Sequence, residues 1–134
     1  MIRAVLDTNV LVSSLLSSGP PAAIMDLIAS GKIIPFFSNL IFVEYRDVLL
    51  RKKFGFSHLH VMCLMNDILR TGIAVESDPP SKITMTHEED RKFFDAAVHA
   101  KAYLITGNIK HFPRKLFVVN PVQFLAVYHE AYRL

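Results

Sequence analysis

The segment IRAVLDTNVL, which spans Ile2–Leu11, decides how the rest of the chain is interpreted. Its apolar run stops at Asp7, Thr8 and Asn9, and an apolar pattern with helical spacing follows immediately. This order is typical of a buried parallel strand that leads through a turn into a helix. Because ligands of open α/β sheets bind where the strands end at their carboxyl side, Asp7 is a candidate site residue. The alternative is that Asp7 or Asn9 merely caps the first helix.

The composition is typical of a globular protein with a well-buried sheet. Of its 134 residues, 51% are hydrophobic and 20% charged, which excludes a disordered chain and fits one domain over residues 1–134. No apolar run approaches the roughly 20 residues of a membrane span, and Asp7 interrupts the first run too early for a signal peptide. We therefore expect a cytoplasmic protein with no membrane partner. The formal net charge of +3 is compatible with a nucleic-acid partner but does not establish one.

Apolar runs with the length of strands alternate with segments of helical spacing. Strands are predicted at 2–6, 33–37, 73–75, 103–106 and 117–119. Helices are predicted from about residue 10, at 22–29, 40–53, 58–70 and 90–102, and after Asn120. The polar stretch 77–89 is interpreted as a loop, and Cys63, the single cysteine, as a core filler. This alternation predicts an α/β fold with three layers, in which a parallel sheet of five strands lies between helices.

Acidic and amide side chains recur where a site at the sheet edge would need them. Glu44 lies on the apolar stripe of its helix, where a carboxylate is costly unless it pairs with a cationic side chain or binds a metal. Asp90 opens a later helix, where capping is the ordinary role of an acid. Asn108 follows a strand end as Asp7 does, although asparagine is also an ordinary turn residue. Asp95 is less well placed for such a site, and we interpret it as a secondary ligand or as one partner of an ion pair.

Together, four of these residues predict a metal site at the carboxyl edge of one sheet: Asp7, Glu44, Asp90 and Asn108. Three carboxylates in one cleft repel one another, and a hard divalent cation would relieve that repulsion. Oxygen ligands of this kind suit Mg²⁺ or Mn²⁺, whereas the six scattered histidines give no zinc-binding spacing. Such a site would activate a water molecule and stabilise charge on a phosphate group.

Several motifs taken together resemble the PIN domain. They are VLDTNVL at 5–11, FVEY at 42–45, EDRKF at 89–93, YLITGN at 103–108 and NPVQFL at 120–125. Their order and spacing cover essentially the whole chain, and they are most similar to the toxin components of bacterial toxin–antitoxin pairs. The resemblance implies a five-stranded parallel sheet between helices. It also implies a Mg²⁺- or Mn²⁺-dependent ribonuclease, often dimeric, that a cognate antitoxin holds inactive.

Carried over position by position, the resemblance implies roles for individual residues. Three acids match the metal-binding and catalytic positions: Asp7, Glu44 and Asp90. Supporting polar positions, whose hydroxyl or amide would orient a ligand or a water, are matched by Thr8, Asn9 and Thr106. Asn108 stands where the family commonly has a fourth acid. An amide can hold a metal or a water but brings no charge, which weakens the case for a second metal.

Basic residues near this edge are candidate RNA contacts, because phosphate groups are bound mainly by lysine and arginine. Lys110 and His111 lie next to Asn108 in the sequence, and Arg91 follows Asp90. The basic run 51–53 is interpreted instead as a solvated helix end. Apolar residues along 59–69 would support a homodimer, or they could belong to the core.

We weigh three functions on these observations. The first is a metal-dependent endoribonuclease that acts as the toxin of a toxin–antitoxin pair. The second is a catalytically weakened PIN domain that binds RNA or a partner protein, which the amide at Asn108 favours. The third is a phosphotransferase that forms an aspartyl phosphate at Asp7. That chemistry usually uses a second aspartate two residues later, and Asn9 occupies that place.

Overall fold

Five short parallel strands form one sheet in the order β3-β2-β1-β4-β5. The computed structural model describes residues 1–76 and 80–133. The strands are β1 (Arg3–Leu6), β2 (Ile34–Phe37), β3 (Ile73–Ala74), β4 (Tyr103–Ile105) and β5 (Val118–Val119). The central strand β1 is therefore paired on both sides, with β2 and with β4.

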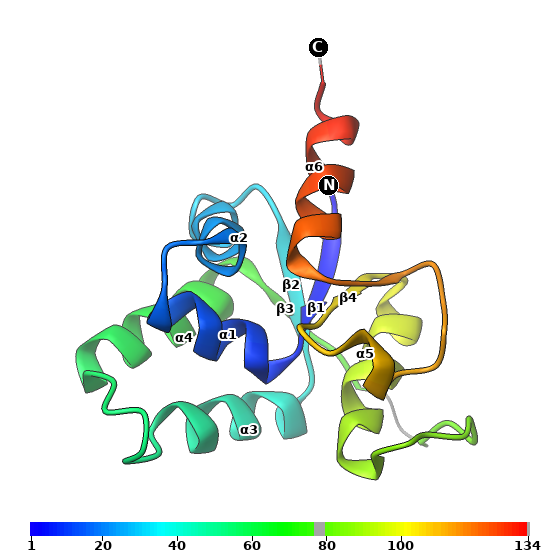
Figure 1. Ribbon diagram of the computed structural model, residues 1–134, viewed down its shortest axis with the longest axis horizontal. Coiled ribbons are helices and arrows are strands. Elements are labelled where there is room, and N and C mark those ends of the chain that lie inside the picture. Colours follow the sequence, from blue (N-terminus) through cyan, green and yellow to red (C-terminus); the bar gives the residue numbers. More distant parts are fainter. Residues whose placement is uncertain (77–79, 134) are drawn as a thin grey trace.

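Helices cover both faces of this sheet, as the sequence predicts for a three-layer α/β/α fold. The α-helices in the described residues are α1 (Thr8–Leu16), α2 (Pro20–Ala29), α3 (Asn39–Leu49), α4 (His58–Thr71), α5 (Arg91–Ala100) and α6 (Pro121–Ala131). Two short 3₁₀ turns, η1 (Glu88–Asp90) and η2 (Ile109–His111), precede α5 and follow β4. Figure 1 shows α1 to α4 gathered on one side of the strands and α5 on the other.

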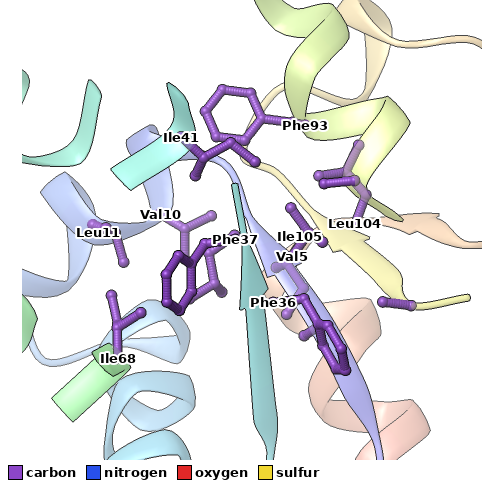
Figure 2. Close-up of a cluster of buried hydrophobic side chains, with 14 of the residues drawn as sticks. Val5, Val10, Leu11, Phe36, Phe37, Ile41, Ile68, Phe93, Leu104 and Ile105 are labelled. Atoms are coloured by element: carbon purple, nitrogen blue, oxygen red, sulfur yellow. The ribbon is translucent and has the colours of Figure 1, made fainter. Parts of the chain in front are cut away.

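The core lies where these layers meet the central strand. Ala4, Val5 and Leu6 of β1 are at most 1% exposed, as expected for a parallel strand with both faces covered. Figure 2 shows side chains of α1, α3, α4 and α5 that converge on the strands, including Val10 of α1 and Phe93 of α5. Burial on both faces explains why the central strand is an uninterrupted apolar run from Ala4 to Leu6, whereas both residues of the edge strand β3 are exposed.

Capping residues fix where several helices begin. The side chain of Ser38 accepts a hydrogen bond from the Ile41 amide at 3.2 Å and starts α3. At α6, Asn120 and Gln123 form a capping box, in which each side chain bonds to the backbone N–H of the other residue. Both starts agree with the sequence prediction. Helix α2 begins two residues earlier than predicted because proline suits the first turn.

Two sequence predictions are wrong, and in each the position of the buried stripe of a helix gives the reason. The helix predicted over 40–53 ends at Leu49, because the positions that would continue its buried stripe are Lys52 and Lys53. Cys63 is exposed rather than in the core. The buried stripe of α4 consists of Val61, Leu64, Met65 and Ile68, and Cys63 falls beside that stripe. For Cys63, the apolar neighbourhood in the sequence suggested more burial than the structure shows.

The remaining boundaries differ from the predictions by a residue or two. The helix predicted over 90–102 is the 3₁₀ turn η1 followed by α5. Part of the loop predicted over 77–89 falls on residues 77–79, which lie outside the described residues. Within the described ranges, no single helix is long and apolar enough to cross a membrane. Helices α1 and α2 reach that length and hydropathy only as a pair, bent by 103°.

A buried hydrogen bond ties α3 to the end of β1. The hydroxyl of Tyr45, which is 1% exposed, donates to the Leu6 carbonyl at 2.5 Å. We predict that Tyr45→Phe lowers the free energy of unfolding by about 1–2 kcal/mol, because the Leu6 carbonyl loses its partner in a dry environment. Urea denaturation measures this change. Tyr132→Phe, on an exposed ring, serves as the control, and equal stability of both variants would contradict the prediction.

Candidate functional site

Asp7 lies at the carboxyl end of the central strand and is 8% exposed. Its Oδ2 accepts a hydrogen bond from the Thr106 hydroxyl at 2.9 Å and another from the Asn9 amide at 3.3 Å. Asp7 occupies the N-cap position of α1, but its side chain makes no capping hydrogen bond within the described part of the chain. Helix capping therefore does not account for this carboxylate.

The ends of β1 and β4 are joined by a short hydrogen-bond network. Thr106, which is fully buried, donates its hydroxyl to Asp7 and accepts the backbone N–H of Asn108 at 2.9 Å. Asn9 accepts the backbone N–H of Gly107 at 3.1 Å. The two motifs predicted to meet at the sheet edge thus do meet there. Asn108 is exposed, and its backbone rather than its amide makes this contact.

Glu44 reaches the same edge from α3 and is paired with a lysine. The Thr8 hydroxyl donates to Glu44 Oε2, and the ammonium of Lys92 lies 2.8 Å from Glu44 Oε1. Of the two sequence interpretations of Glu44, the structure shows the ion pair. The pairing of Lys92 with Glu44 cannot be predicted from the sequence, because it depends on how α5 is rotated against α3.

Asp90 closes the 3₁₀ turn η1 beside two imidazole rings. His111 Nδ1 lies 3.5 Å from Asp90 Oδ2, and the rings of His111 and His87 stand 4.1 Å apart between centroids. Burial raises the pKa of Asp90, and the negative charge of Glu89 adds to the rise. The two imidazoles and the Lys92 ammonium act in the opposite direction. Asp90 therefore lies within the field of the Lys92 ammonium and next to an imidazole, whereas the hydrogen-bond partners of Asp7 are neutral.

The electrostatics connect the three acids. Burial raises the pKa of Asp7 to about 6, and the negative charges of Asp90 and Glu44 add to that rise. The hydrogen bond from Thr106 opposes the rise only in part. Asp90 and Glu44 are thus close enough to disfavour the charge of Asp7, and Asp7 has no cationic side chain bonded to it among the residues described here.

The pattern of the PIN-domain family matches residues 3–110 of this chain. The chain belongs to that family. It is 31% identical, over 113 residues, to an uncharacterized protein of Methanocaldococcus jannaschii, which covers 80% of this chain and 71% of that protein. A similar fold is found in the crystal structure of VapBC2 from Rickettsia felis bound to a DNA fragment from its promoter, with a TM-score of 0.58. The two sequences are 17% identical, and the match covers 89% of this chain and 97% of the VapBC2 chain. PIN domains are generally nucleases that depend on divalent metal ions.

The donors at this edge of the PIN domain fit such an ion by their chemistry. Carboxylate, amide and hydroxyl oxygens are the ligands that hard divalent cations take. Among the residues that the structure describes, no three acidic, histidine or cysteine side chains surround one point as a metal site requires. The Lys92 ammonium already occupies one oxygen of Glu44. The donor types are therefore suitable, although the side chains are not arranged around a common centre.

Three other predicted site residues form no hydrogen bond or ion pair with Asp7 within the described parts of the chain. Asp95 is buried on α5, where its Oδ2 accepts the Ser81 amide at 3.0 Å; its Oδ1 has no hydrogen-bond partner in the described ranges. Arg91 donates to the Ser81 carbonyl at 2.8 Å and pairs with Glu88, so its guanidinium is already engaged. Lys110 is exposed on η2. Of the predicted basic residues, His111 comes nearest to an acid of the edge.

A groove of about 910 Å³ runs beside this edge, between α3 and the start of α5. Both Glu44 and Lys92 line it, and its wall also contains the apolar side chains of Leu40, Val43 and Val48. The groove therefore gives a path of molecular size that leads up to the acidic edge.

The raised pKa of Asp7 predicts that the free energy of unfolding depends on pH. Because the folded chain releases this proton near pH 6 rather than 3.8, burial of the charged form costs about 3 kcal/mol of unfolding free energy, and this cost develops as the pH rises from 4 to above 6. In EDTA, Asp7→Asn removes that cost, so we expect the variant to gain stability relative to the native chain between pH 4 and 7.5. Urea denaturation at both pH values measures it.

The matched control for this comparison is Asp26→Asn, on an exposed position of α2. It should follow the pH profile of the native chain. If Asp7→Asn also followed that profile, the raised pKa of Asp7 would be refuted.

Proposed function

We propose that this PIN domain, taken as the single domain 1–134, is a metal-dependent endoribonuclease that hydrolyses RNA phosphodiester bonds. The observation that carries the proposal is the state of Asp7. It is a buried carboxylate at the carboxyl end of the central strand, with neutral hydrogen-bond partners, and burial and two nearby acids raise its pKa to about 6. A divalent cation is the ligand that would stabilise this arrangement, because it neutralises carboxylates that have no other counter-ion.

The residues that would hold Mg²⁺ or Mn²⁺ are the three acids and the amide predicted from the sequence: Asp7, Glu44, Asp90 and Asn108. When bound, the ion would supply an activated water and would stabilise negative charge on the phosphate. The side chains around the acids have positioning roles. Thr106 and Asn9 fix the carboxylate of Asp7, and Thr8 fixes that of Glu44. Asp95 supports the segment near Ser81 rather than the edge itself.

RNA would approach over η2 and the groove between α3 and α5. Lys110 is exposed on η2 and is available to a phosphate, and His111 stands at the acidic edge. Arg91 is a weaker candidate, because it is bonded to Glu88 and Ser81. The net charge of +3 favours approach of a polyanion without confining it to one surface.

A toxin role is supported by the fold shared with VapBC2 of Rickettsia felis. On this basis we propose a cognate antitoxin as the partner and the cytoplasm as the compartment. A homodimer is supported by α4, which leaves Leu59, Met62 and Leu69 more than half exposed on its outer face. Apolar side chains grouped in this way are typical of a surface that another protein covers.

The second candidate function is a PIN domain that binds RNA or a protein without cutting. Two observations favour it: Asn108 brings no charge to the fourth position, and Glu44 already has a cation in Lys92. Both reduce the attraction of the edge for metal ions. The two functions differ in whether purified protein cleaves RNA.

Cleavage of a mixed set of structured RNAs tests the proposal directly. We expect products with Mg²⁺ or Mn²⁺, none with EDTA, and loss of cleavage in Asp7→Ala, because that variant lacks the central carboxylate. The absence of cleavage with either metal would contradict the enzymatic function. RNA binding by the intact chain would then support the second candidate, and Asn108→Asp would show whether the missing charge is the cause.

Thr106→Val tests the positioning role separately. It removes the hydroxyl that fixes Asp7 but keeps the shape of the side chain, so we expect cleavage to fall about 10- to 100-fold, as for other residues that orient metal ligands. Initial rates at saturating Mn²⁺ measure the effect. Thr84→Val, on an exposed loop position, is the control. An unchanged rate in Thr106→Val would remove Thr106 from the functional site.

A further inference from the structure

The turn that joins α3 to α4 (Figure 1) carries two phenylalanine rings stacked on each other. The rings of Phe54 and Phe56 are nearly parallel, with 5° between their planes, and their centres lie 5.2 Å apart. Phe56 packs against the hydrophobic core, and Phe54, which is half-buried, stacks on Phe56. Between them Gly55 has a positive φ of 62°, a backbone conformation that glycine adopts without strain. A defined turn thus holds a flat aromatic ring at the molecular surface.

Three consecutive cationic residues precede the stacked rings. Arg51, Lys52 and Lys53 are all exposed, and the Lys53 ammonium lies 5.1 Å from the centre of the Phe54 ring. No carboxylate in residues 1–76 or 80–133 forms an ion pair with any of the three. Neighbouring like charges repel one another, and an anionic ligand relieves that repulsion. An aromatic ring beside several cations is typical of sites for single-stranded nucleic acid, where bases stack on the ring and phosphates contact the cations.

The groove between α3 and α5 lacks the positive charge that would hold a polyanion. Six carboxylates and three cationic side chains line it within the described ranges, so RNA in the groove needs an anchor elsewhere. Arg51 connects the groove with the turn. Its side chain lines the groove, and its carbonyl accepts the Phe54 N–H at 3.1 Å. Because Glu44 lines the same groove, a strand held at the turn has a path to the acidic edge.

We propose that the turn 51–56 is a binding site for single-stranded RNA, in which a base stacks on Phe54 and phosphates contact the basic run 51–53. The inference rests on the proposed function, because it says where the substrate of the nuclease is held outside the acidic edge. Every base has a flat face, so stacking at this turn selects unpaired RNA rather than a particular sequence. The turn therefore determines which part of an RNA strand reaches Glu44.

Tryptophan fluorescence tests the stacking without an activity assay. The chain contains no tryptophan, so Phe54→Trp introduces a single reporter at the turn. We expect a single-stranded RNA of mixed sequence, added in EDTA, to quench this fluorescence. Tyr132→Trp is the matched control, because Tyr132 is an exposed ring beside a second ring, that of Tyr128, and its fluorescence should persist. Equal quenching in both variants, or none in Phe54→Trp, would overturn the inference.

Fluorescence anisotropy with the same labelled RNA in EDTA tests the two kinds of contact separately. Phe54→Leu keeps an apolar side chain but removes the ring, so binding should weaken about 5- to 150-fold, the range for one stacked base. Lys52→Gln combined with Lys53→Gln should reduce the slope of log Kd against log salt by about 1.4, because each phosphate contact of a single strand contributes about 0.7. The control, Arg114→Gln combined with Lys115→Gln, removes an equally exposed basic pair and should leave the slope unchanged.

The outcomes separate the inference from the proposed function. If the native chain cleaves RNA but Phe54→Leu and the lysine variant bind RNA as the native chain does, the inference is overturned and the nuclease stands. If the native chain binds RNA through Phe54 without cleaving it, the inference stands and the enzymatic function fails. Unchanged RNA binding by Phe54→Leu, together with loss of a dimer in sedimentation, would overturn the inference in favour of a contact between two copies. If Phe54→Leu does not fold, as judged by circular dichroism, the lysine variant decides.

Discussion

The hydrogen bond from Thr106 to Asp7 is the contact on which the rest of the candidate site depends. It joins the ends of two paired strands, β1 and β4, that lie far apart in the sequence. The same hydroxyl accepts the Asn108 amide, and the Asp7 amide bonds to the Ile105 carbonyl. One threonine therefore fixes both the first motif and the turn after β4. Any shift in the register of these strands would separate the carboxylate from the residues that orient it.

The three acids at this edge differ in how the surrounding side chains compensate their negative charge. The Lys92 ammonium pairs with Glu44 and also acts on Asp90, whereas the side chains bonded to Asp7 within the described ranges are a hydroxyl and an amide. A buried carboxylate with neutral partners reduces the stability of the fold at neutral pH. The apolar core around β1 offsets this loss. Residues that weaken a fold while they face a common edge are typical of functional sites.

The sequence predicted the layers and the meeting of the motifs because both follow from local patterns. Parallel strands buried on both faces are continuous apolar runs, and polar residues directly after two such runs must share an edge. The pairing of Lys92 with Glu44 could not be predicted, because it depends on the rotation of α5 relative to α3. The exposure of Cys63 could not be predicted for a similar reason, because a cysteine among apolar residues does not reveal which stripe of its helix faces the core.

The strand order β3-β2-β1-β4-β5 has a consequence for how this protein can change. From β1 the chain builds the sheet outward through β2 and β3, and then it returns to the other side of β1 for β4 and β5. The loops after β1 and β4 consequently leave the sheet in opposite directions, which makes their junction a topological switch point. Asn108 lies there, exposed and outside the core. Its side chain can therefore be exchanged without any repacking of the fold, so the charge at this position can change independently of structural stability.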